Sequence, residues 1–525
     1  MTLARPDRRS VVLAPLLALA ASVALAAPVP PPCDDATFLR RVSLDLVGRQ
    51  PNPTEIKAFL ADPAEGKREA VIERLLADPA WATTWASYFR DVILYRRSDE
   101  RAIAMARPLE TFLAEQLAKD AAWDAIARAM ITATGVPSQQ GETAIIMAQM
   151  GETSDIAAEV SRVFTGVQLQ CAQCHDHFTD RWKRRQFHEF AAFFPRIAIQ
   201  RGPGDGFERY TVVSYDREPR KARGKNPDNP RRGDLEHEMP HLDDPSLPGT
   251  VMKPRFFLDS PALPLGTPDK ERRRTAARLI TADENPWFAR AIVNRVWTEL
   301  VGDGFYDGID DLGPDREPRS PEVLDELCRR FVAADHDLRA LMRDVMATPA
   351  YQSASRSRAD AERPRGEASC PQRLRADQLF TQVLTALGVD EAAVGGRGER
   401  KQGGPRGELF SPRGGFNQVF GYDPGLPRDE VVGSIPQALL LMNSQPLARA
   451  IDGERRITLL GRLLAETRDD RDLADELHLR ALARHATPAE VAVCLDHVRD
   501  TGDRAQAFED IFWALVNSAE FIHRK

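Results

Sequence analysis

The apolar residues of this 525-residue chain recur at helical spacing over most of its length. Residues 154–169 place four apolar side chains on one helical stripe: Ile156, Val160, Val163 and Val167. The start of another helix is marked by Asn52 as the N-cap, Pro53 at the first helical position and Glu55 at the third. These patterns predict a mainly α fold.

A stretch of different composition interrupts the helical pattern. Residues 197–258 are rich in glycine, proline and charge, and within them only 209–215 and 251–257 indicate strands, which we expect to form a small β hairpin sheet. Helical spacing resumes at about residue 269. We therefore predict two helical domains joined by an irregular segment: an N-terminal domain (34–200), a connection with β structure (201–258) and a C-terminal domain (259–525).

The first residues have the layout of a secretory signal peptide. Three arginines precede an apolar run from Val11 to Ala27, and Ala24-Leu25-Ala26 has the small-x-small form of a cleavage site. The run is short for a membrane span, and an uncleaved N-terminal anchor is the alternative. We predict a signal peptide over residues 1–26, an extracytoplasmic location (periplasmic or secreted), and no transmembrane segment in the mature chain.

Composition narrows the functional classes. The chain is 42% hydrophobic and 28% charged, which is ordinary for a globular protein. Its formal net charge of −7 gives no reason to expect nucleic-acid binding. Six cysteines in 525 residues do not make a disulfide-stabilised scaffold. The sequence does not predict an oligomeric state.

The most specific chemical signal is Cys171-Ala-Gln-Cys174-His175. C-x-x-C-H is the attachment signature of c-type haem, in which the two thiols add to the haem vinyl groups and the histidine binds iron axially. Four nearby phenylalanines would supply an apolar wall, and four basic residues would meet the propionates: Phe187, Phe190, Phe193, Phe194, Arg181, Lys183, Arg184 and Arg185. The candidates for a sixth ligand are His177, His188, His237, Met239 and His241.

Two other hypotheses explain the same residues. A zinc ion could take its ligands from Cys171, Cys174, His175 and His177, although four ligands within seven residues are crowded, and a more distant His188 or His241 fits more easily. A Cys171–Cys174 disulfide is also compatible with an oxidising compartment. The specificity of the motif favours haem, and all three hypotheses stay open.

Other candidate sites are weaker. Residues 306–315 contain four aspartates, which are possible calcium ligands but lack the spacing of an EF-hand: Asp307, Asp310, Asp311 and Asp315. Capped turns between helices are the role we favour for them. The sequence has no G-x-S-x-G and no H-E-x-x-H, so a familiar hydrolase signature is missing and no catalytic residue is predicted.

Long segments of the chain resemble the planctomycete-type cytochrome c family. Its first domain of unknown function is similar to FLRRVSLDLVGRQPNPTEIKAFLAD (38–62), VSRVFTGVQLQCAQCHDHFTDRWKRRQFHEFAAFF (160–194) and MPHLDDPSLPGTVMKPRFF (239–257). Its C-terminal partner domain is similar to residues 285–314, 320–352 and 434–451. The resemblance covers about residues 36 to 524.

The resemblance implies that Cys171, Cys174 and His175 anchor a haem. The family usually continues as His-Asp-His-Pro, and here Phe178 replaces the proline. We expect an exported c-type haem protein that transfers electrons outside the cytoplasm, with a redox partner that the sequence does not identify. The alternative is a non-redox extracytoplasmic scaffold or binding protein whose motif closes a zinc site or a disulfide. Whether the chain is an enzyme stays open.

Overall fold

The structure is a computed structural model that describes residues 31–96, 100–203, 206–216, 235–242, 244, 246–258, 260–356, 368–391, 411–426 and 431–525. The predicted mainly α fold is confirmed, and strands are confined to two-stranded sheets within these residues. The predicted signal peptide at 1–26 lies outside them. None of the described helices is long and apolar enough to cross a bilayer.

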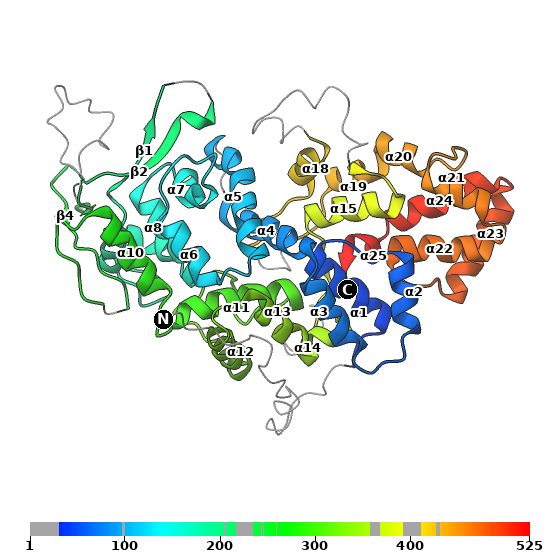
Figure 1. Cartoon of the computed structure of the whole chain (residues 1–525), viewed down its shortest axis with the longest axis horizontal. Helices are drawn as coiled ribbons and strands as arrows, with labels where there is room; N and C mark the ends of the chain where they lie inside the picture. Colours follow the sequence, from blue (N-terminus) through cyan, green and yellow to red (C-terminus); the bar gives the residue numbers. More distant parts are fainter. Residues whose placement is uncertain are drawn as a thin grey trace, which may run out of the picture.

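The first part of the chain is helical up to a β hairpin (Figure 1). Its elements are α1 (Asp35–Val47), α2 (Pro53–Ala61), α3 (Lys67–Leu76), α4 (Pro79–Leu94), α5 (Glu100–Ala118), α6 (Trp123–Ile131), α7 (Ala144–Ala148), α8 (Thr153–Thr165), the 3₁₀ turn η3 (Leu169–Gln173) and α9 (Arg184–Ala191). The predicted start of α2 is confirmed, because Asn52 Oδ1 accepts from the Glu55 amide and the Glu55 carboxylate accepts from the Asn52 amide.

The hairpin forms with a different partner from the one that we predicted. Strand β2 (Tyr210–Ser214) pairs antiparallel with β1 (Ile197–Arg201), from Ile197 opposite Ser214 to Arg201 opposite Tyr210. The predicted strand 251–257 was wrong beyond its first residue, which belongs to the two-residue β4 (Thr250–Val251) opposite β3 (Glu238–Met239). Pro254 has no amide proton to donate to a sheet, and the segment instead buries Phe256 and Phe257.

The second part of the chain contains α10 (Asp269–Ile280), α11 (Pro286–Val301), α12 (Pro321–Ala333), α13 (Leu338–Met346), α14 (Pro349–Gln352), β5 (Gln372–Arg373), α15 (Ala376–Leu387), α18 (Pro412–Phe420), α19 (Ile435–Asn443), α20 (Gln445–Ile451), α21 (Leu459–Glu466), α22 (Asp470–Leu482), α23 (Pro488–Thr501), α24 (Arg504–Val516), α25 (Ala519–Ile522) and β6 (His523–Arg524). Strand β6 pairs antiparallel with β5.

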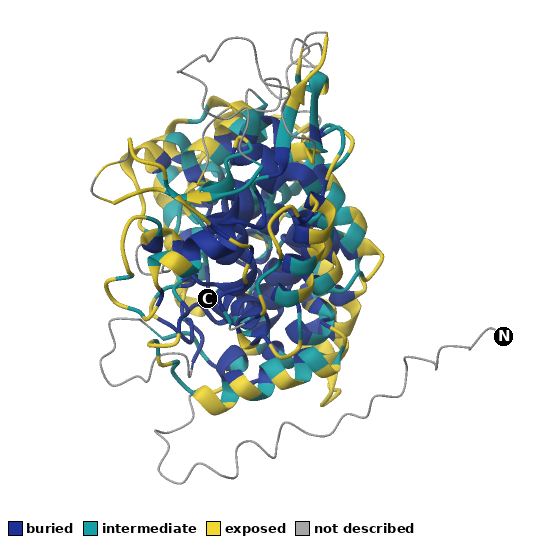
Figure 2. Ribbon diagram, turned by 90° about the vertical axis from the view of Figure 1, so that its left-hand side faces the viewer, coloured by how far each residue is buried: buried dark blue, intermediate teal, exposed yellow. Residues whose placement is uncertain are grey.

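The buried apolar residues form two clusters. Figure 2 shows buried residues in the interior of the molecule and exposed residues on the outer faces of the helices. The first cluster joins α1–α9 to α10–α14, and the second joins α15 to α18–α25, which occupy the right-hand side of Figure 1. Leu44 of α1 belongs to the second cluster, and Leu479 of α22 belongs to the first. The packing therefore groups α10–α14 with the N-terminal helices. The domain boundaries at 200 and 258 were predicted from sequence composition and stay a prediction.

The last strand is fixed to the first helix by a buried ion pair. Arg524 Nε lies 2.7 Å from Asp45 Oδ1, and both side chains are about 95% buried. Asp45 also accepts a 2.8 Å hydrogen bond from the Tyr351 hydroxyl of α14. The pair thus links α1, α14 and β6.

We expect Arg524→Ala to lower the free energy of unfolding by about 3–5 kcal/mol, because it leaves the buried Asp45 carboxylate without its cation. Arg499→Ala is the matched control, since Arg499 pairs with Asp496 at the surface, where both side chains are more than 60% exposed. That change should cost about 0–1 kcal/mol in the same urea titration. Equal effects of the two substitutions would contradict the role given to the buried pair.

Candidate functional site

The cysteine motif follows α8 directly. Gly166 ends the helix with a φ of +65°, in the left-handed region that favours glycine. A side chain here would also meet Leu312, 3.0 Å from the position of a Cβ atom. The Gly166 carbonyl accepts a 2.9 Å hydrogen bond from the Leu312 amide. The chain therefore turns out of α8 while packed against the loop that carries the four aspartates.

The turn η3 sets the direction of the two thiols. A 3₁₀ helix has three residues per turn, so side chains three apart lie on the same side. Leu169 and Ala172 are fully buried, whereas Cys171 and Cys174 are both exposed and neither is in a disulfide. The two sulfurs are therefore presented together on the solvent side.

His175 is exposed beside them. Its Nδ1 lies 2.7 Å from the carbonyl oxygen of Asp176, which only accepts, so the proton of the neutral ring is on Nδ1. The lone pair of Nε2 is then available to a ligand, and a histidine that binds metal commonly donates its other N–H to a carbonyl in this way. The ring lies 4.1 Å from that of Phe178, which is 84% exposed.

Residues 176–184, which follow the motif, are held together by hydrogen bonds within the segment. The His177 amide donates to the Trp182 carbonyl over 2.8 Å, and the Asp176 carboxylate accepts from the Arg184 amide at 3.0 Å and from Lys183 at 3.1 Å. Trp182 is buried against Phe257. These contacts fold residues 176–184 into a compact loop between η3 and α9.

His188 and His237 form a pair beneath the turn. His188 Nε2 lies 3.0 Å from the Gln173 carbonyl oxygen and therefore donates to it, so its Nδ1 accepts from His237 Nε2 over 2.8 Å. The two rings are stacked with centroids 5.1 Å apart. Burial lowers the pKa of His188 to about 4, with a contribution from Arg184, and burial together with His188 lowers the pKa of His237 to about 4.

The other predicted ligands lie apart from this pair. His177 Nδ1 accepts from the Thr179 amide, exposed His241 accepts from the Asp244 amide, and Met239 is half-buried in β3. In the part of the chain that the structure describes, no three histidine, cysteine, aspartate or glutamate side chains are grouped so as to hold a metal. The structure therefore brings His188 and His237 together but does not assemble the predicted ligand sets.

The residues of the predicted apolar wall and the predicted propionate partners are engaged within the chain. The four phenylalanines of α9 and the residues after it are fully buried in the first cluster, where Phe190 packs against Phe256 and Phe257. Each basic residue already has a partner within the chain: Arg181 with Asp315, Lys183 with Asp176, Arg184 with the Pro240 carbonyl and Arg185 with Glu189. The apolar spacing predicted that the phenylalanines are buried, but it did not predict which neighbouring residues bury them.

The four aspartates of the acidic loop all pair with arginines. Asp310 is 1% exposed and contacts Arg162 of α8 at 2.6 Å and also Arg295 of α11. Burial opposes ionisation, but these two guanidinium groups hold the pKa of Asp310 below its ordinary value. The other pairs are Asp307 with Arg319, Asp311 with Arg316 and Asp315 with Arg181. The arginines supply the positive charge that a calcium ion would otherwise bring.

The acidic loop thereby clamps the motif. Besides the Asp310 and Asp315 pairs, Arg316 donates to the Thr179 hydroxyl at 2.9 Å and to its carbonyl at 3.1 Å. The side chains of this clamp come from sequence positions more than 130 residues apart. No local pattern could have paired them, although an aspartate-rich loop and an arginine in an apolar helix are each visible in the sequence.

Two protein-family models match the chain. One is described as a protein of unknown function (DUF1549) and matches residues 19–198, and the other as a protein of unknown function (DUF1553) and matches residues 272–410. The chain carries both domains. This pair is typical of planctomycete-type proteins. No curated protein and no solved structure gives a match. The DUF1549 match includes the cysteine motif, and the DUF1553 match includes the acidic loop, so the clamp joins the two domains.

We expect the histidine pair to make stability depend on pH. Because both folded-state pKa values lie near 4 and the ordinary value is 6.5, protonation favours the unfolded chain. The pair's contribution is therefore complete above about pH 6.5 and is lost progressively as the pH falls towards 4. Urea titrations between pH 7.5 and 5 should show this loss in the wild type and a weaker slope in H188Q/H237Q.

The matched control is H485Q/H497Q, which changes two exposed histidines that pair with Asp475 and Asp510. It should not remove the fall in stability from pH 6.5 downwards. An identical pH slope in the wild type and in H188Q/H237Q would show that the buried pair does not cause it.

Proposed function

We propose that the chain is an exported c-type haem protein that transfers electrons outside the cytoplasm, with Cys171 and Cys174 as the covalent attachment points and His175 as the axial ligand. The observation that carries the proposal is the geometry of η3, which exposes both thiols on one side of a single turn next to a histidine with a free Nε2 lone pair. Export rests on the basic and apolar pattern of residues 1–26.

The donor set fits covalent haem attachment at the surface. Both thiols are open to solvent, as a maturation system that joins them to the vinyl groups requires. The Asp176 carbonyl fixes the tautomer of His175, and Phe178 offers an exposed apolar ring beside it. When bound, haem would supply a one-electron couple. The clamp from Asp315 to Arg181 would hold the turn while charge moves, and transfer to a partner would be outer-sphere.

The second candidate is a non-redox extracytoplasmic scaffold or binding protein in which the motif forms a zinc site or a disulfide. It is favoured by the burial of the α9 phenylalanines and by the internal pairing of the four basic residues, which leave few groups to surround a macrocycle. Two cysteines one 3₁₀ turn apart also suit a small disulfide loop. Electron transfer stays the leading proposal because C-x-x-C-H is the more specific signal.

The test is to express the whole chain in a host that matures c-type cytochromes and to measure its intact mass and visible spectrum. We expect the mass to rise by one haem and a reducible absorption band to appear. Both should be lost in Cys171→Ala/Cys174→Ala, because no thioether can form. Cys328→Ala is the control, since Cys328 is half-buried in α12, and it should keep both signals.

A colourless protein of unmodified mass, in cells that mature a control cytochrome, would contradict the haem proposal. Zinc in metal analysis would then support the metal form of the second candidate. A mass lower by two protons, restored on reduction and absent from Cys171→Ala/Cys174→Ala, would support the disulfide form.

A further inference from the structure

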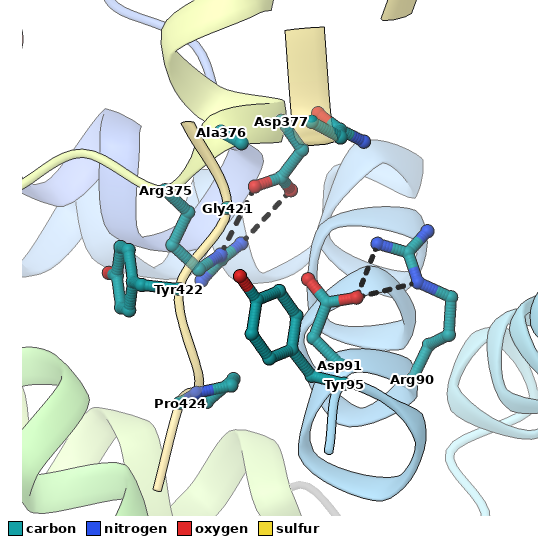
Figure 3. Close-up of a pocket in the computed structure, with 10 residues that line it drawn as sticks. Arg90, Asp91, Tyr95, Arg375, Ala376, Asp377, Gly421, Tyr422 and Pro424 are labelled. Atoms are coloured by element: carbon teal, nitrogen blue, oxygen red, sulfur yellow. Dashed lines mark hydrogen bonds and ion pairs between the residues drawn. The ribbon is translucent and has the colours of Figure 1, made fainter. Parts of the chain in front are cut away.

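A solvent-open hollow of about 100 Å³ lies between the two hydrophobic clusters, away from the cysteine motif (Figure 3). Its walls come from the end of α4, the start of α15 and the segment from α18 to Pro424. A site between two packed units is a common place for a small ligand.

Two arginine–aspartate pairs set the charge of the walls. Arg90 Nε and Nη2 both contact Asp91 Oδ1, at 2.8 and 2.7 Å. Arg375 Nε and Nη2 contact the two oxygens of Asp377, each at 3.3 Å. The dashed lines in Figure 3 mark these contacts. Each carboxylate is thus held in place by a guanidinium group in the same wall, and each guanidinium group also pairs with a second carboxylate, Arg90 with Glu110 and Arg375 with Glu299.

Two acceptor atoms at the pocket have no hydrogen-bond donor among the described residues. Both contacts of Arg90 end on Asp91 Oδ1, and Oδ2 accepts no hydrogen bond from a described residue. The Oδ1 atom of Asn417 is buried and has no partner among the described residues. Burial and the charge of Asp377 raise the pKa of Asp91 against the lowering effect of Arg90. A ligand that brings hydrogen-bond donors would satisfy these groups.

An aromatic ring stands at the same place. Tyr95 is 43% exposed, and Figure 3 shows it between Asp91 and the backbone of residues 421–424. That backbone is held against the end of α4 by the ion pair of Arg96 with Asp423 at 2.6 Å. The ring therefore stands at the pocket beside a held backbone segment and offers an apolar face to an occupant.

The lining carries charges of both signs, which disfavours a ligand of either single charge. A cation would meet the guanidinium groups of Arg90 and Arg375, and an anion would meet the carboxylates of Asp91 and Asp377. An uncharged ligand that carries several hydroxyl groups meets neither obstacle. A sugar ring combines those hydroxyl donors with a C–H face that packs on a tyrosine.

We propose that this pocket binds one unit of a neutral sugar, whose hydroxyl groups donate to Asp91 and Asn417 and whose ring lies against Tyr95. The proposal is independent of what the cysteine motif holds.

The test uses the full chain and saturation-transfer NMR with five neutral sugars: glucose, galactose, mannose, xylose and N-acetylglucosamine. At least one should bind, and Asn417→Ala and Tyr95→Ala should each weaken that binding by about tenfold, as expected for one lost hydrogen bond or ring contact. Asn417→Ala should leave thermal stability unchanged, because it removes a polar atom that has no partner. Tyr215→Ala, at a similarly exposed tyrosine, is the control and should bind as the wild type does.

Putrescine and sulfate serve as charged probes of similar or smaller size. The proposal is overturned if none of the five sugars binds the folded wild type, if sugar binding is unchanged in both Asn417→Ala and Tyr95→Ala, or if putrescine or sulfate binds more tightly than every sugar. Binding of a sugar that both variants weaken and Tyr215→Ala does not would support it.

Discussion

The buried carboxylate of Asp310 holds together the part of the molecule that matters most for function. It lies between Arg162 of α8 and Arg295 of α11, helices that belong to the two matched family domains. Arg162 also donates to the Val92 carbonyl of α4, the helix whose end lines the pocket. A buried ion network of this kind adds little net stability compared with apolar packing, but removing one member leaves uncompensated charge and costs about 3–5 kcal/mol. It therefore fixes one relative position of three helices.

The cysteine turn and the pocket depend on this position in different ways. The turn is a surface feature, whose thiols are exposed because the opposite side of η3 is buried, and the acidic loop holds it from behind through Leu312, Asp315 and Arg316. The pocket is formed by α4 and by two segments from the second cluster. Its loop also approaches the network, since a Cβ atom on Gly425 would lie 3.1 Å from Asp310 Oδ2. The buried carboxylate of Asp310 is thus close to the elements that hold both the cysteine turn and the pocket.

The features that could be predicted from the sequence are those set by interactions between residues close together in the chain. Helices were predictable because capping and apolar spacing act within a few residues, as the hydrogen bonds between Asn52 and Glu55 show. The strand at 210–214 was predictable, but its partner at 197–201 was not, because strand pairing depends on packing beyond the turn. The phenylalanines of α9 were identified as apolar from the sequence, and the structure buries them in the core. Their place beside a haem stays a prediction, since apolar spacing does not say which neighbour packs on them. The His188–His237 contact, the clamp and the pocket join residues from distant segments, and only the fold brings them together.

Hydrogen exchange measured by mass spectrometry on Asp310→Asn tests the clamp most directly. If the Asp310 network positions the cysteine turn, the amides of residues 166–183 and 303–316 should exchange faster than in the wild type, while those of α22–α24 should be unchanged. Asp307→Asn, which alters an exposed aspartate of the same loop, should leave the exchange of residues 166–183 as it is in the wild type. Wild-type exchange at residues 166–183 in Asp310→Asn would contradict the account, because the turn would then be held by its own packing alone.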